Sequence, residues 1–110
     1  MKGEVHITKQ GQYALIYKKG SSWVNKFLVM KAMPNRLDTS RYGFSVSKQL
    51  GKAVVRNRTK RLLREILRKA PLNPGWDIIF IARRQAAGTP YREMEETVRN
   101  LLSRARILAK

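Results

Sequence analysis

The segment from Lys52 to Lys69 constrains the fold most, because its side chains separate into two faces at about 100° per residue, the period of an α-helix. The predicted apolar face contains Val55, Leu62, Leu63 and Ile66. The side away from it is polar and basic, with spacing i, i+3, i+4, i+7 and i+11, and contains Asn57, Lys60, Arg61, Arg64 and Arg68. Such a helix needs a core against one face and leaves the other to solvent or to an anionic partner.

Two predicted strands flank this helix along the chain. Residues 76–82 are almost continuously apolar, which is typical of a central strand buried on both faces. Residues 41–48 alternate instead, and so predict a strand with one core face and one open face. The core face would hold Tyr42, Phe44 and Val46, and the open face Gly43, Ser45 and Ser47. Because a helix separates the two strands, they could pair in parallel through a crossover.

The two ends of the chain predict further elements. Residues 7–19 predict a short helix that ends at Gly20, and residues 23–33 predict a first strand. In that strand we assign Phe27 and Val29 to the core face, which leaves Leu28, Met30 and Ala32 on the open side. The last helix is predicted to start at Thr89-Pro90, with the Thr89 hydroxyl as its N-cap. Its buried residues would be Met94, Val98, Leu101, Leu102, Ala105 and Leu108.

The order helix, strand, strand, helix, strand, helix predicts an α+β fold. Helices would pack on a small mixed sheet to form a ribosomal-protein-like sandwich with a βαβ crossover. A chain of 110 residues has the size of one compact unit, so we expect residues 1–110 to form a single RNA-binding domain.

The charge of the chain points to a polyanionic partner. Twenty-four Lys and Arg against seven Asp and Glu give a formal net charge of +17, and much of it lies in one segment. A merely solvated basic surface and an anionic membrane surface are the competing interpretations. There is no Cys, no apolar run long enough to span a membrane and no apolar segment of a signal peptide at the N-terminus. We therefore expect a cytoplasmic protein.

The basic helix favours RNA over a purely solvated surface. Like charges stacked at i, i+3 and i+4 destabilise a helix, and Glu65 alone does not offset them. Arg outnumbers Lys there, which suits bidentate contacts to phosphate and stacking on bases. Single-stranded or irregular RNA is the better target, because the major groove of A-form RNA is too deep and narrow for a helix to read. A basic DNA-binding module would normally come with a helix-turn-helix or a dimerisation element, and neither is evident.

Two consecutive blocks of sequence resemble a known family. The runs RYGFSVSK at 41–48 and GKAVVRNRTKRLLRE at 51–65 closely resemble the protein subunit of bacterial ribonuclease P, and the resemblance extends from about Ile7 to the C-terminus. It implies a ribonucleoprotein endonuclease that removes the 5′ leader of precursor tRNA, with the RNA subunit as its catalytic centre. The partners would be that RNA and precursor tRNA, Mg²⁺ would be held mainly by the RNA, and this chain would contribute no catalytic residue.

The resemblance also implies two sets of site residues. The surface that binds the catalytic RNA would comprise Lys52, Arg56, Asn57, Arg58, Arg61 and Arg68. The cleft for the single-stranded leader would comprise Tyr13, Tyr17, Leu28, Met30, Ser45, Lys48, Lys60 and Arg64. The sequence departs from the family at Tyr13, where a Phe after an acidic residue is usual, and at Met30, where an aromatic residue is frequent. A ribosome-associated or chaperone-like RNA-binding protein is the alternative function.

A nuclease centre or a metal site built by this chain alone is not expected. His6 is the only histidine, and no Cys or carboxylate cluster accompanies it. Two-metal cleavage needs several acidic ligands, and the sequence offers no paired carboxylates. Asp77 could contact a hydrated Mg²⁺, but nothing in the sequence requires it.

Overall fold

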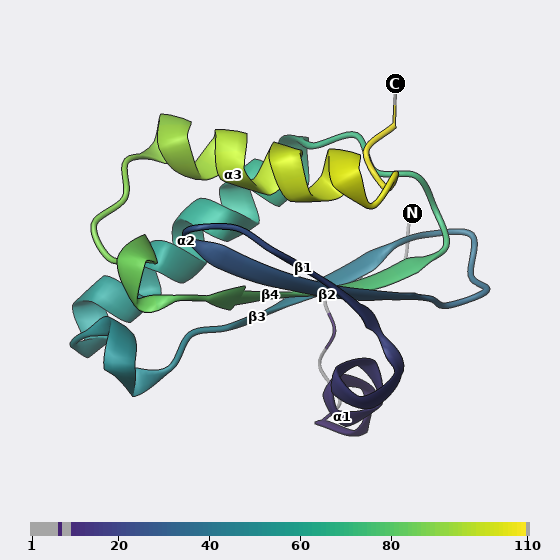
Figure 1. Ribbon diagram of the computed structural model, residues 1–110, viewed down its shortest axis with the longest axis horizontal. Helices are drawn as coiled ribbons and strands as arrows, with labels where there is room; N and C mark the ends of the chain where they lie inside the picture. Colours follow the sequence, from purple (N-terminus) through teal and green to yellow (C-terminus); the bar gives the residue numbers. More distant parts are fainter. Residues whose placement is uncertain (1–6, 8–9, 110) are drawn as a thin grey trace.

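The computed structural model describes Ile7 and residues 10–109, so His6 lies outside the described residues. Four strands form one sheet, with α2 and α3 on one face and α1 on the other (Figure 1). The elements, in chain order, are α1 Gln10–Lys19, β1 Ser21–Val24, β2 Leu28–Pro34, β3 Arg41–Ser45, the 3₁₀ turn η1 Lys48–Leu50, α2 Ala53–Lys69, β4 Trp76–Ala82, the 3₁₀ turn η2 Arg84–Ala86 and α3 Tyr91–Arg104. None of the helices described is long and apolar enough to cross a membrane.

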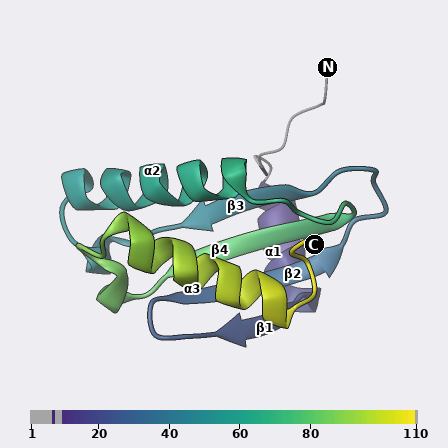
Figure 2. The ribbon, with the colours of Figure 1, turned by 90° about the horizontal axis from the view of Figure 1, so that it is seen from above.

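The sheet is mixed, with strand order β1-β2-β4-β3, and this confirms the predicted α+β class. β3 and β4 are parallel, while β2 is antiparallel to both β1 and β4. α2 connects β3 to β4 across the sheet, and α3 lies beside α2 (Figure 2). The apolar strand β4 is therefore central, as its sequence predicts, and β1 and β3 are the two edges.

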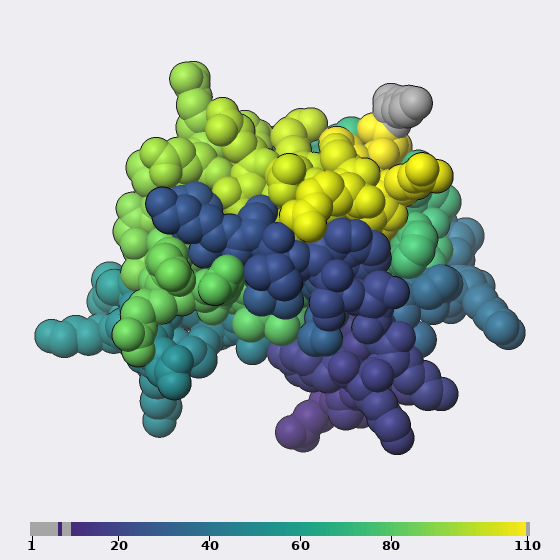
Figure 3. All heavy atoms as spheres, in the orientation of Figure 1, coloured from purple at the N-terminus to yellow at the C-terminus, as the bar shows by residue number. Residues whose placement is uncertain are grey.

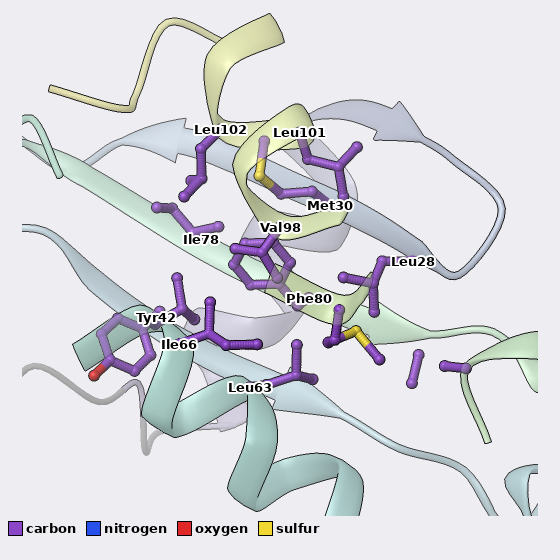
Figure 4. Packing of buried hydrophobic residues seen from close by; sticks show 14 of the residues in the cluster. Leu28, Met30, Tyr42, Leu63, Ile66, Ile78, Phe80, Val98, Leu101 and Leu102 are labelled. Carbon is purple, nitrogen blue, oxygen red and sulfur yellow. The ribbon is translucent and has the colours of Figure 1, made fainter. Parts of the chain in front are cut away.

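The main core lies between the sheet and the pair α2 and α3. Met30 and Phe44 are both in register with Phe80, so the three side chains point to the same face of the sheet. Met30 and Phe80 are fully buried there, beneath Leu63 of α2 and Val98 of α3 (Figure 4). The alternation predicted for β3 is confirmed, because Tyr42, Phe44 and Val46 all pack on this cluster.

The face predicted for β2 is wrong. Leu28, Met30 and Ala32 were expected on the open side of the sheet, but their side chains lie in the main core, each at most 1% exposed. The physical reason is the pairing with β4, in which Val29 and Lys31 share a face with Ile81 and Ile79 and Met30 shares the opposite face with Phe80. A shift of one residue in the alternation moves every side chain of a strand to the other face.

The strand predicted over residues 23–33 is a hairpin of two strands, β1 and β2. Asn25 forms the turn, since its side-chain Oδ1 accepts hydrogen bonds from the backbone amides of Phe27 (3.3 Å) and Leu28 (3.0 Å). The backbone amide of Asn25 in turn donates to the Leu28 carbonyl (3.0 Å), and Val24 pairs with Val29 across the hairpin. A side-chain oxygen that imitates a backbone turn is a typical use of Asn.

The helices follow the predicted patterns with local differences. In α2 the buried residues are Thr59, Leu63, Ile66 and Leu67, while Val55 and Leu62 are only half-buried. α3 begins one residue later than predicted, with Pro90 as its N-cap, and the Thr89 hydroxyl donates to the Gln85 carbonyl instead (3.3 Å).

α1 covers part of the opposite sheet face with a small second cluster of Ile7, Ile16 and Ile79. It forms a projection away from α3 (Figure 3). α1 ends at Lys19, as predicted, and the Gly20 amide donates to the Ile16 carbonyl (2.8 Å). A Cβ at Gly20 would lie 2.6 Å from that carbonyl oxygen, so only glycine fits this close approach.

Candidate nucleic-acid interface

The N-terminal half of α2 is a dense positive surface. Asn57, Arg58 and Arg61 are exposed there, as predicted, together with Lys52 at the N-cap position. The first turn of the helix contains no acidic residue, and the N-cap makes no side-chain hydrogen bond. Amide groups at the start of a helix attract anions, and here nothing in the first turn competes with an incoming phosphate.

Two arginines of this surface differ in how they are held. Arg58 reaches toward the start of α3 and donates a long hydrogen bond of 3.4 Å from Nη1 to the Thr89 carbonyl. Arg56 is half-buried, and its Nε is the buried side-chain nitrogen or oxygen that lacks a hydrogen-bond partner within the described part of the chain. A buried donor without an acceptor costs free energy.

A cleft of about 430 Å³ follows the edge of β3, with α2 on one side and α1 on the other. Lys60 and Arg64, one helical turn apart, line its α2 wall, and Tyr13 lines its α1 wall. The remaining lining comes from Ile7, Tyr42, Gly43 and Phe44. The Ile7 amide donates to the Tyr42 carbonyl (2.9 Å), which holds Ile7 against the strand edge. The structure therefore brings together three of the residues predicted for the leader cleft.

Tyr13 can lie against β3 because residue 43 is glycine. A Cβ at Gly43 would stand 2.7 Å from Tyr13 Cζ and closer still to its hydroxyl oxygen. Burial raises the pKa of the Tyr13 phenol, and a hydrogen bond with the Phe44 backbone partly opposes that rise. Tyr13 is thus a packed, neutral aromatic side chain whose ring remains half-exposed at the cleft wall.

The sheet face beside α1 carries a row of half-buried side chains, of which only Ser45 was predicted for the leader cleft. Val29, Ile81 and Ser45 form one row across β2, β4 and β3, and each is half-buried. This row replaces Leu28 and Met30, which cannot touch a ligand on this side because they are fully buried under α2 and α3. Lys31 could have indicated which face of β2 is the open one, because a lysine in a strand favours the less buried side.

Three more residues predicted for the leader cleft, Tyr17, Ser45 and Lys48, are not among the residues that line it. Tyr17 is 39% exposed on α1, and Lys48 is exposed in η1, between β3 and α2. Arg68 belongs to the other predicted set, the surface for the catalytic RNA. Arg68 is exposed at the far end of α2, where its Nη2 contacts Glu65 Oε2 at 2.6 Å. This ion pair and the neighbouring Lys69 lower the pKa of Glu65.

Asp77 serves the fold. It is 6% exposed, and its two carboxylate oxygens accept hydrogen bonds from Arg41 Nε (2.8 Å) and Nη2 (2.6 Å). Asn35 Nδ2 donates to the same carboxylate at 2.9 Å. With three donors engaged, Asp77 ties β3, β4 and the loop after β2 together, and the carboxylate is not presented to a metal ion.

A basic helix beside a half-apolar cleft on an α+β sandwich points to a nucleic-acid-binding protein, and comparisons with known proteins define the family. The family model described as Ribonuclease P matches residues 1–106. The chain belongs to this family, and it is a subunit of the endoribonuclease ribonuclease P. The matches do not indicate the ribosome-associated alternative.

Relatives and solved structures agree with this assignment. The ribonuclease P protein component of Dehalococcoides mccartyi is 48% identical over 110 residues, covering 100% of this chain and 92% of the relative. The crystal structure of the Staphylococcus aureus RNase P protein aligns with a TM-score of 0.88 at 34% identity, over 97% of this chain and 100% of that chain. The RNase P protein from Thermotoga maritima aligns with a TM-score of 0.84 at 32% identity, over 90% and 96%. The match with the Dehalococcoides mccartyi protein covers the whole chain and therefore includes both the basic helix and the cleft.

Proposed function

We propose that this subunit binds the catalytic RNA with the N-terminal half of α2 and holds the 5′ leader of precursor tRNA in the cleft along β3. The observation that supports this division most strongly is the position of Lys60 and Arg64. They share a helix with Arg56 and Arg58, yet their side chains line a cavity whose other wall is the Tyr13 ring. One helix can thus face two RNA strands at once.

The electrostatics of α2 support the contact with the catalytic RNA. The helix begins with a lysine N-cap and no acidic side chain in its first turn, an arrangement that destabilises the free helix. The unpaired Nε of Arg56 adds to this cost. Phosphate groups would offset the unfavourable charge at the start of the helix, and each phosphate contact also releases counterions into solution.

The shape of the cleft supports a single-stranded ligand. Its lining combines cations that suit phosphates, Lys60 and Arg64, with flat or apolar groups that suit bases, among them Tyr13 and Phe44. Stacking of a base on an aromatic side chain contributes about 1–3 kcal/mol and tolerates any base. The row of Val29, Ile81 and Ser45 would extend the apolar surface under the strand.

The chemistry of cleavage would then rest with the RNA. Within Ile7 and residues 10–109, no three His, Cys, Asp or Glu side chains come together as a metal site, and Asp77 is engaged by Arg41 and Asn35. Mg²⁺ held by the RNA subunit would supply the activated water. The residues of this chain bind and orient the two RNAs, which lowers the barrier by fixing the geometry of the encounter.

The leader assignment is tested with Arg64→Ala in the reconstituted ribonucleoprotein. Removing this cation from the cleft should weaken binding of precursor tRNA by about five- to tenfold, the effect of one hydrogen bond of about 1 kcal/mol, and leave the affinity for mature tRNA unchanged. Arg99→Ala removes an arginine of α3 that is likewise exposed, and it serves as the matched control. Equal losses for precursor and mature tRNA would contradict the assignment.

The contact with the catalytic RNA is tested with Arg61→Ala, which changes an exposed side chain of α2. The variant should bind the RNA subunit more weakly, and the slope of log K against log salt should fall by about one for the lost phosphate contact. An unchanged dissociation constant and an unchanged slope at matched salt would show that Arg61 faces solvent in the complex.

A further inference from the structure

The groove beside α2 does not end at the leader cleft. Tyr42 lines the cleft on one side and a second cavity of about 490 Å³ on the other. This second cavity lies one helical turn beyond Arg64, between the end of α2, the loop before β3 and the loop before β4. The Tyr42 hydroxyl points away from the packed core side chains (Figure 4). The two cavities are therefore neighbours along one continuous flank of α2.

The second cavity has the makeup of a nucleotide site. Leu67 and Leu72 supply apolar surface, and Arg68 and Asp38 supply opposite charges at its rim. Its volume falls in the range of small-ligand pockets, which combine apolar walls with a few polar groups that fix orientation. Arg68 can donate to a phosphate without leaving Glu65, because only its Nη2 contacts that carboxylate and Nε and Nη1 stay available.

Asp38 is the informative residue of this cavity. Within the described part of the chain it makes no ion pair, although the protein carries a net charge of +17. A carboxylate at the rim of a groove for a polyanion repels phosphates, so general electrostatics gives it no role there. The Asp38 carboxylate can still act as a hydrogen-bond acceptor, because carboxylates accept hydrogen bonds from the amino groups of bases.

We propose that the second cavity binds one nucleotide of the leader, upstream of the segment held in the cleft. Arg68 contacts its phosphate, and Asp38 accepts a hydrogen bond from the amino group of its base. The site selects adenine, cytosine or guanine over uracil. Uracil has no amino group, and its ring N–H lies between two carbonyl oxygens that repel a carboxylate. This inference rests on the proposed function, in which the catalytic RNA lies at the start of α2 and the leader therefore runs from Lys60 towards Arg68.

The test measures the affinity of the reconstituted ribonucleoprotein for precursor tRNAs whose leaders lengthen one nucleotide at a time. After the cleft is filled, one further nucleotide should increase affinity by about fivefold if it is adenosine, cytidine or guanosine, and by less if it is uridine. Asp38→Ala should remove this preference by weakening the three amino-bearing leaders only. General electrostatics predicts the opposite sign, since loss of a negative charge would tighten binding of all four.

Two further variants separate the outcomes. Arg68→Ala should abolish the gain from the added nucleotide whatever its base, whereas Lys69→Ala, which removes the other cation paired with Glu65, should not. A normal response to Arg64→Ala together with no effect of Asp38→Ala or Arg68→Ala would overturn the second site and leave the cleft intact. Insensitivity to Arg64→Ala as well would overturn the leader cleft itself. Asp38 is exposed, so its replacement leaves the core unchanged.

Discussion

Gly43→Ala tests the geometry of the cleft most directly. The new Cβ would stand 2.7 Å from Tyr13 Cζ, closer than real Cβ contacts, so the Tyr13 ring must move away from β3. Overpacking of this kind costs about 1–3 kcal/mol. In the absence of the ring, alanine should be the better residue, because glycine in a strand is less favourable by about 0.5–1 kcal/mol.

The two effects predict a double-mutant cycle with a coupling of about 2 kcal/mol. Urea unfolding should show that Gly43→Ala destabilises the protein in the wild-type background but is neutral or stabilising in the Tyr13→Ala background. Each kcal/mol lowers the melting temperature by about 4–8 °C in a domain near this size. An equal loss in both backgrounds would refute the argument, since the cost would then come from the strand and not from the contact with Tyr13.

Three further predictions concern the core, the ion pair and the phenol. Met30→Ala should lower the free energy of unfolding, measured in urea, by about 2–5 kcal/mol. The folded variant should show the same change in affinity for precursor and mature tRNA. Val29→Ala should instead weaken the binding of precursor tRNA selectively. Asp77→Ala should lower the free energy of unfolding by about 3 kcal/mol in the same assay, because it leaves the partly buried Arg41 without its ion-pair partner. A loss below about 1 kcal/mol would contradict this prediction. Phenolate absorbance should show Tyr13 titrating above the ordinary value of about 10, a phase missing in Tyr13→Phe. Because its folded pKa is raised, wild-type stability should be complete below pH ~10 and fall above it more than in Tyr13→Phe.

Most of the fold can be predicted from elements whose hydrophobic pattern is compatible with only one kind of secondary structure. α2 separates its faces clearly at helical period, and β4 is apolar throughout, so its central place needed no knowledge of its neighbours. β2 is different, because apolar residues occupy both of its faces and the alternation alone does not choose between them. Lys31 marks the open face, but the choice is settled only by the register with β4.

Residue spacing predicts the part of the site that one element forms, whereas Tyr13 entered the predicted cleft only through the family resemblance. Lys60 and Arg64 lie one turn apart on α2, and their common direction can be read from spacing alone. That Tyr13 faces them depends on where α1 crosses the edge of β3, and this in turn depends on Gly43, whose close approach to a distant ring leaves no local signal. The row of Val29 and Ile81 likewise exists only through strand pairing.

The sheet order has a consequence for the protein before it meets RNA. A sheet with two open edges can recruit further strands and form edge-to-edge aggregates. Here β1 offers only four residues, and Arg104 Nη1 covers one of its end carbonyls, that of Val24, at 2.9 Å. At the other edge, the Ile7 amide already occupies the Tyr42 carbonyl, between the basic groups of α2 and the tyrosine of α1. The arrangement that we propose for binding the RNA leader should thus also disfavour edge-to-edge association between newly made copies of the chain.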